Sequence, residues 1–256
     1  MPQHLDDILN RLEKHSAITG HDIVDLRRAV FNDDFVCEGE ADRLFDLNNS
    51  KKEKAVGWAD FFVAAITNFL IRQTKPIGYV DAEHARWFIK RIAADGHIET
   101  ETELRTLFRV LNEALDATDV LVDFALSEVK AALIDGEGHM GRTRLSARKS
   151  ISLDDVKMIE KVLYASGGDG NIAVTEKEAE ILFDINDVCI AEPDAKDAWQ
   201  SVFVYGVTNS VMFYTPHKNI SRDDALRSEE WLEGRGGFFG SMISVPNFGG
   251  AIADMT

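Results

Sequence analysis

Apolar residues recur every three to four positions along most of this chain, beginning at Leu5. This spacing places side chains on one face of an α-helix, so it predicts helical structure. Three later apolar series each follow a residue that is favoured at a helix start, namely Thr19, Asp81 and Ser152. Each series ends at an acidic turn that leads into a second helix. The pattern as a whole predicts an all-α fold, a helical bundle of helix–acidic loop–helix units.

The starts of two of these helices are predicted in more detail. Thr19 is followed three residues later by Asp22, and Ser152 is followed in the same way by Asp155. In a capping box, the first residue's hydroxyl and the later residue's side chain each bond to the backbone N–H of the other. We expect both pairs to form an acidic variant of this box.

Three divergent repeats of one unit account for the recurrence. In the second helix of each copy a Glu precedes a Phe by five residues, and the first and third copies also share residues in a third, apolar helix. Self-similarity at this period is typical of stacked helical repeats. The shared residues are Trp58, Val63, Thr67 and Asn68 in the first copy and Trp199, Val204, Thr208 and Asn209 in the third.

The repeats predict the organisation of the chain. The stretch between the second and third copies is interpreted as an exposed linker, or as an electrostatic clip to an acidic neighbour, since it holds Arg142, Arg144, Arg148 and Lys149. The expected segments are an N-terminal helix (1–16), repeat 1 (17–74), repeat 2 (77–135), a linker (136–149), repeat 3 (150–215), and a C-terminal helix with a glycine-rich tail (216–256).

The charge balance narrows the choice of partners. The formal net charge is −16, which disfavours nucleic acid and anionic lipid and favours cations or a protein partner. The longest apolar runs, 61–71 and 202–214, are shorter than the roughly 20 residues that span a bilayer. We therefore expect buried core helices there and no membrane insertion. Two distant cysteines and the lack of a signal peptide predict a cytoplasmic protein.

The acidic loops are the candidate metal sites. Crowded carboxylate and amide oxygens are the ligands that Ca²⁺, Mg²⁺ and Mn²⁺ prefer, so such a divalent cation is the expected cofactor. The alternative needs no metal, because an Asp before Gly shapes a turn and a Glu in the first helical turn favours the positive end of the helix dipole. The candidate ligands are Asp95, Glu99 and Glu103 in repeat 2, which His97 could join, and Asp169, Asn171, Glu176 and Glu178 in repeat 3.

The loop of repeat 2 resembles a known family. The run Ile92-Ala93-Ala94-Asp95-Gly96-His97-Ile98, followed by Glu99, Glu101 and Glu103, is similar to the signature of the tellurite-resistance TerB-like family. Repeat 3 matches less fully over 168–172, and repeat 1 has Asp34 where the family has Gly. The resemblance implies an all-helical fold, a bacterial cytoplasmic setting, divalent-metal binding, and a role in tellurite resistance or another metal or envelope stress response.

A second resemblance, to the EF-hand calcium loop, is confined to half of the motif. Asp169, Gly170, Ile172 and Glu176 fall at the expected offsets of that loop, but the earlier ligand positions hold Ala165 and Gly167. A loop without its first two ligands predicts poor calcium binding.

The sequence carries no motif for an enzyme. It has no Gly-x-Ser-x-Gly, no P-loop, no His-Glu-x-x-His and no dinucleotide fingerprint. We therefore expect a non-enzymatic TerB-like binding or scaffold protein that a divalent cation tunes. One alternative is a metal-independent protein–protein interaction module, which uses a groove between repeats or a tail with Phe238, Phe239 and Phe248. Another is a metal-dependent hydrolase. The oligomeric state stays open.

Overall fold

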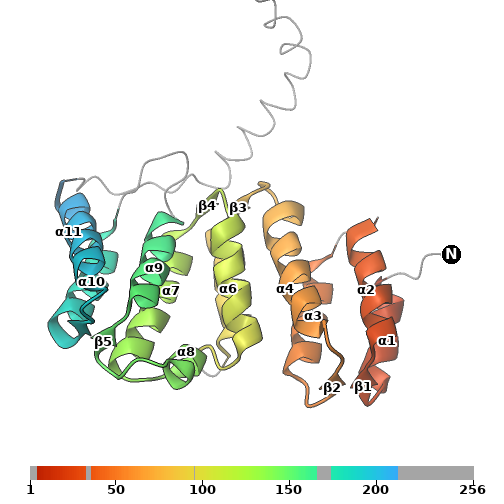
Figure 1. Ribbon diagram of the computed structural model, residues 1–256. Helices are drawn as coiled ribbons and strands as arrows, with labels where there is room; N and C mark the ends of the chain where they lie inside the picture. Colours follow the sequence, from red (N-terminus) through yellow and green to blue (C-terminus); the bar gives the residue numbers. More distant parts are fainter. Residues whose placement is uncertain (1–4, 33–35, 95, 166–173, 213–256) are drawn as a thin grey trace, which may run out of the picture. The chain divides into compact units, whose positions relative to one another are not determined.

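The computed structural model describes residues 5–32, 36–94, 96–165 and 174–212 (Figure 1). The chain divides into two units, 1–219 and 220–256, and all that follows concerns the first of these. The helix and glycine-rich tail expected over 216–256 lie outside the described residues.

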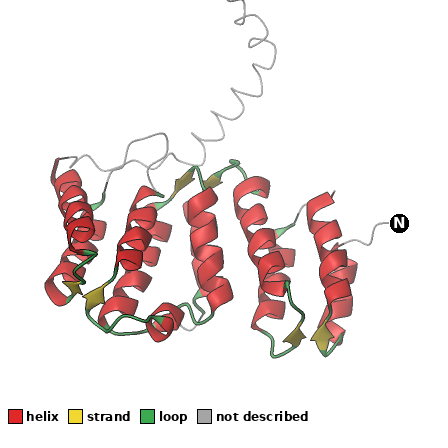
Figure 2. Ribbon diagram, in the orientation of Figure 1, coloured by secondary structure: helices red, strands yellow, loops and turns green. Residues whose placement is uncertain are grey.

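The described part is mainly helical, as the apolar spacing predicts (Figure 2). None of its helices combines the length and apolar character that crossing a membrane requires. The helices are α1 (Leu5–Lys14), α2 (Gly20–Asn32), α3 (Glu38–Asn49), α4 (Trp58–Asn68), a π-helical continuation η1 (Phe69–Gln73), α5 (Ala82–Ile92), α6 (Glu101–Glu113), α7 (Asp119–Ile134), α8 (Gly138–Thr143), α9 (Leu153–Tyr164), α10 (Glu176–Val188) and α11 (Lys196–Met212).

The connections between these helices contain three short parallel strand pairs, which the sequence did not predict. In each pair one strand precedes a helix and the other follows the next helix. The order strand, helix, helix, strand, helix thus occurs three times in the described residues, and we call these stretches the first unit (17–73), second unit (79–134) and third unit (150–212). The pairs are β1 (Ala17–Ile18) with β2 (Glu53–Lys54), β3 (Tyr79–Val80) with β4 (Asp116–Ala117), and β5 (Ser150–Ile151) with β6 (Ile190–Ala191).

Side-chain caps begin the first helix of each unit. The Asp22 carboxylate accepts the Thr19 hydroxyl at 2.6 Å and the Thr19 backbone N–H at 2.9 Å. The Asp155 carboxylate does the same for Ser152, at 2.7 and 2.8 Å. Both predicted capping boxes are therefore confirmed. In the second unit Asp81 caps α5 by accepting two backbone N–H bonds of its first turn.

Neighbouring units pack against each other through the same two helices in each case. The third helix of one unit lies against the second helix of the next, so α4 contacts α6 and α7 contacts α10 (Figure 1). Between the first and second units, the Phe45 ring of α3 meets Trp87 of α5 at 5.7 Å, and within the first unit the same ring meets Phe62 of α4 at 5.0 Å, both edge to face. Such geometry adds to the stabilisation that burial of the rings contributes.

The N-terminal helix α1 covers the first unit. It contacts α2 and α3, as α7 contacts α9 and α10. Its apolar side is fully buried, and Arg43 of α3 binds Asp6 and Glu13 of α1 at its edge. The buried residues of α1 are Leu5, Ile8, Leu9 and Leu12, each no more than 1% exposed.

The segment expected as a linker is more structured than an exposed connection. It contains α8, and two of its arginines, Arg142 and Arg144, pair with acids elsewhere in the chain. Arg142 binds Glu99 at 2.6 Å. Arg144 binds Asp155 at 2.6 Å, and both of these side chains are less than a tenth exposed. The structure thus shows a buried electrostatic clip at Arg144, while Arg142, Arg148 and Lys149 in the same segment are exposed.

The two long apolar runs have different surroundings. Residues 61–71, in α4 and η1, are buried as expected, except that Ala64 and Asn68 are partly exposed. In α11, however, Val204, Val211 and Met212 are 52%, 71% and 71% exposed. The expectation of a buried core helix is therefore wrong for this side of α11, over which no described element lies, whereas the other side packs against α9 and α10. Residues 213 and 214 of the predicted run lie outside the described residues.

Candidate functional site

The structure places the predicted metal ligands in several different settings. Asp95, Asp169 and Asn171 lie outside the described residues. The four remaining carboxylates, Glu99, Glu103, Glu176 and Glu178, belong to described residues around the two loops.

Glu103 is the inner half of a capping box. Its carboxylate accepts the Thr100 hydroxyl at 2.8 Å and the Thr100 backbone N–H at 3.1 Å, while the Glu103 N–H donates to the same hydroxyl. Glu103 is only 6% exposed, and this burial raises the pKa of its carboxyl above the usual value. The side chain is therefore used to start α6.

Glu178 does the same for α10. One carboxylate oxygen accepts the Thr175 backbone N–H at 2.8 Å, and the other, Oε1, is buried and makes no hydrogen bond. The residue is 1% exposed. Burial raises the pKa of the carboxyl to about 7, and repulsion from Asp123 and Asp119 of α7 adds to the shift. Like Glu103, Glu178 is therefore used to start its helix.

The last two carboxylates lie apart from these caps. Glu99 forms the ion pair with Arg142 in α8. Glu176 is the first residue of α10 and is exposed. Over the described ranges no three His, Cys, Asp or Glu side chains come close enough together to hold a metal ion.

A recurrent anchor for the loops was missed by sequence reasoning. In each unit, a buried aliphatic residue between the first and second helices donates its backbone N–H to a side-chain oxygen in the C-terminal half of the third helical segment. The bonds run from Val36 to Gln73 (2.6 Å), from Ile98 to Glu128 (2.9 Å) and from Val174 to Asn209 (2.9 Å). The acceptors differ in residue type and in their distance along the chain, so no common motif marks them.

In the second unit a histidine strengthens this anchor. His97 Nδ1 lies 2.8 Å from Glu128, and its Nε2 lies 2.8 Å from Glu137 at the start of α8. The hydrogen bond to Glu128 raises the pKa of His97 above its ordinary value of 6.5, although partial burial opposes the shift. His97 thus links the loop to α7 and α8.

A second recurrent bond closes the first and third units. The indole N–H of Trp58 donates to Asn48 at 3.1 Å, and that of Trp199 donates to Asn186 at 3.2 Å. Each bond ties the end of a second helix to the start of a third helix. This bond explains why Trp58 and Trp199 occupy matching positions in the two units.

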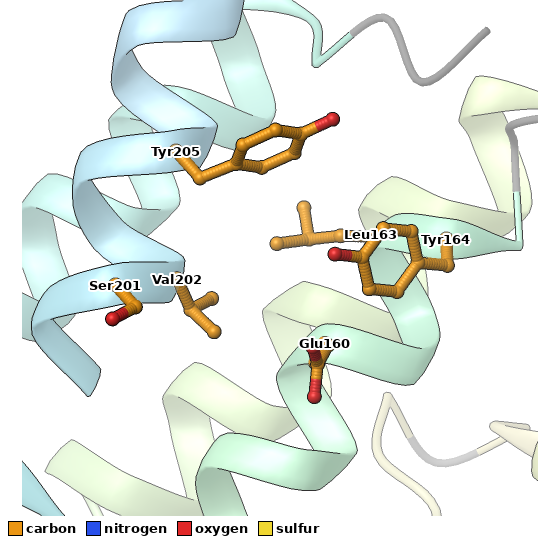
Figure 3. Close-up of a pocket in the computed structure, with 6 residues that line it drawn as sticks. All are labelled: Glu160, Leu163, Tyr164, Ser201, Val202 and Tyr205. Carbon is orange, nitrogen blue, oxygen red and sulfur yellow. The ribbon is translucent and has the colours of Figure 1, made fainter. Parts of the chain in front are cut away.

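An apolar pocket lies between α9 and α11 in the third unit. Its volume is about 270 Å³. Figure 3 shows Tyr205 extending from α11 toward α9, where Leu163 and Tyr164 lie. Tyr164 and Tyr205 are both close to half exposed. The remaining lining residues are Glu160, Ser201 and Val202.

Comparison with known protein families, with curated proteins and with solved structures finds no match to this chain.

Proposed function

We propose that this chain is a non-enzymatic protein-interaction scaffold whose acidic loops do not need a metal ion. The supporting observation is the use of the candidate carboxylates in the described structure. Glu103 and Glu178 close capping boxes, and Glu99 pairs with Arg142. These interactions give Glu99, Glu103 and Glu178 roles in helix initiation and packing that need no metal.

The proposal includes the TerB-like character of residues 92–103, and with it a bacterial, cytoplasmic setting and a stress-related role. Its support is the resemblance of that run, together with the helices α5 and α6 that flank it. The binding chemistry, by contrast, rests on the third unit.

The binding surface of the scaffold is the exposed apolar side of the third unit. The pocket between α9 and α11 is smaller than the roughly 300–1,000 Å³ of most small-molecule sites. Two half-exposed tyrosines at such a pocket suit the apolar side chain of a protein partner, because Tyr offers a large contact area with a polar tip. The net charge of −16 disfavours nucleic acid as that partner.

A thermal melt tests whether a cation tunes this scaffold. Chelator-stripped protein is melted with Ca²⁺, Mg²⁺ or Mn²⁺ against NaCl of equal ionic strength. A cation at one hundred times its dissociation constant stabilises by about 2.7 kcal/mol, which shifts the midpoint by several degrees. We expect no shift beyond the salt control.

Two variants make the result specific. A cation-dependent shift that disappears in Asp169→Ala or Glu178→Gln, but persists in the control Asp154→Asn, would show the cation-tuned alternative to be right. Asp154 is suitable because its side chain is 90% exposed and it belongs to α9, not to either candidate loop.

A further inference from the structure

The exposed side of α11 is a charge-free stripe. Five exposed residues follow one another at helical spacing, and no charged residue occurs from 200 to 212 in a chain in which 28% of residues are charged. We define the α11 stripe as Val204, Tyr205, Thr208, Val211 and Met212. A surface of this kind marks a contact site, since isolated apolar residues are common on protein surfaces and contiguous ones are not.

The first unit shows what normally covers this surface. Aligning Trp199 with Trp58 matches Val204 to Val63, Thr208 to Thr67, Val211 to Leu70 and Met212 to Ile71. These four residues of the first unit are 0–5% exposed, whereas Val204 and Met212 are 52% and 71% exposed. The difference arises because α6 of the second unit lies on α4 and η1. The α11 stripe is thus a unit-to-unit packing face without a described neighbour.

The other end of the array is closed to a second chain. A head-to-tail contact would require the α11 stripe of one copy to lie on the first unit of another copy, in the place that α1 occupies. There α1 buries its whole apolar side, from Leu5 to Leu12, and is fastened by Arg43. Displacing α1 would expose that apolar side to water, so an open chain of copies is disfavoured.

The stripe is instead complementary to itself. Its members are arranged symmetrically about Thr208, with Val204 and Met212 four residues away and Tyr205 and Val211 three residues away. Two antiparallel copies crossing at Thr208 would therefore bring Val204 of one copy against Met212 of the other, and Tyr205 against Val211. In a two-fold interface the same patch serves both chains, as this arrangement allows.

Charge also favours this contact. Two chains that each carry −16 repel one another, and the repulsion is weakest where the meeting surfaces hold no charge. We propose that the partner of this scaffold is a second copy of the chain, bound through the α11 stripe in a closed, antiparallel dimer. This inference rests on the proposed interaction function and names its partner.

Analytical ultracentrifugation of the full chain, from micromolar to several hundred micromolar, tests the proposal. We expect the weight-average mass to rise toward that of two chains as the concentration increases. Val204→Glu combined with Val211→Glu should return it to the 28.6 kDa of a single chain at every concentration. Val56→Glu is the matched control, because Val56 is fully exposed in the first unit and should leave the mass unchanged.

Circular dichroism and a thermal melt of the double variant establish that it is folded. A wild-type mass of one chain at all concentrations overturns the proposal, and so does a dimer that persists in the folded double variant. Neither result bears on the cation experiment, so the dimer can fail while the metal-independent scaffold stands.

Discussion

The backbone N–H of Ile98 donates to the carboxylate of Glu128 at 2.9 Å, across 30 residues of the chain. The bond fixes a loop next to a buried aliphatic side chain, and Ile98 is only 1% exposed. Glu128→Ala leaves both the Ile98 N–H and His97 without this partner. We expect it to lower the free energy of unfolding by about 2–3 kcal/mol, as for loss of a buried charged acceptor.

Urea denaturation measures this loss. The control is Glu137→Ala, which removes the other carboxylate bound to His97 from a half-exposed position. It should cost less than about 1 kcal/mol, the usual range for exposed pairs. Equal losses in the two variants would show that Glu128 has no anchoring role beyond its ion pair.

His97 should make stability depend on pH. Its folded-state pKa lies above the ordinary value of 6.5, so its contribution is fully present below that value and is lost as pH rises through the folded-state pKa. His97→Gln should remove this slope. Thermal melts of both proteins between about pH 5 and pH 9 test the point, since the difference between their midpoints should shrink as pH rises. A constant difference would contradict it.

Glu178 should act in a lower pH window. Its carboxyl titrates at about 7 when folded and has an ordinary value of 4.5. Between these values the folded state holds a proton that the unfolded state has released, so stability falls as pH rises and levels off above 7. Glu178→Gln keeps a capping acceptor and does not titrate. It should therefore gain about 3 kcal/mol over the wild type between pH 4.5 and pH 8.

Urea denaturation at those two pH values provides the measurement. Glu176→Gln makes the same change of charge at an exposed position on the same helix and should show little difference between them. If Glu178→Gln is no more stable than the wild type at the higher pH, burial does not destabilise the ionised form of the Glu178 carboxyl.

The buried ion pair of Arg144 and Asp155 should matter far more than an exposed one. Removing Arg144 leaves a carboxylate that is only 8% exposed without its cation. We expect Arg144→Ala to cost about 3–5 kcal/mol in denaturation experiments. The control is Lys157→Ala, which breaks an exposed pair with Asp154 and should cost under about 1 kcal/mol. A small loss for Arg144→Ala would mean that water replaces the guanidinium.

Local features of the fold could be predicted from the sequence, and long-range ones could not. Thr19 and Asp22 are three residues apart, so helical geometry alone brings them together, and the capping box follows from their types. The acceptors Gln73, Glu128 and Asn209 lie 30 or more residues from the N–H groups that they bind. Their positions depend on how the third helices pack, which the sequence pattern does not specify.

The candidate site shows the same division. Carboxylates lie close together in the sequence at the loops, and this spacing led to the prediction of metal ligands. The structure uses Glu103 and Glu178 as caps, a role that the Thr-x-x-Glu spacing at Thr100 and Thr175 also predicts. That signal was available and could have found both residues. Exposure of Val204 could not be inferred, because it matches Val63 in type and differs only in what lies above it.

Because α1 covers the first unit, further units can be added more easily at one end of the array than at the other. A duplicated unit inserted after α11 would meet a packing face of the kind that α4 and α7 already present to their neighbours. A unit added at the other end would first have to displace Leu5, Ile8, Leu9 and Leu12 from the core. Lengthening by gene duplication is therefore easier on the carboxyl-terminal side, and relatives with more units should keep a helix like α1 at their start.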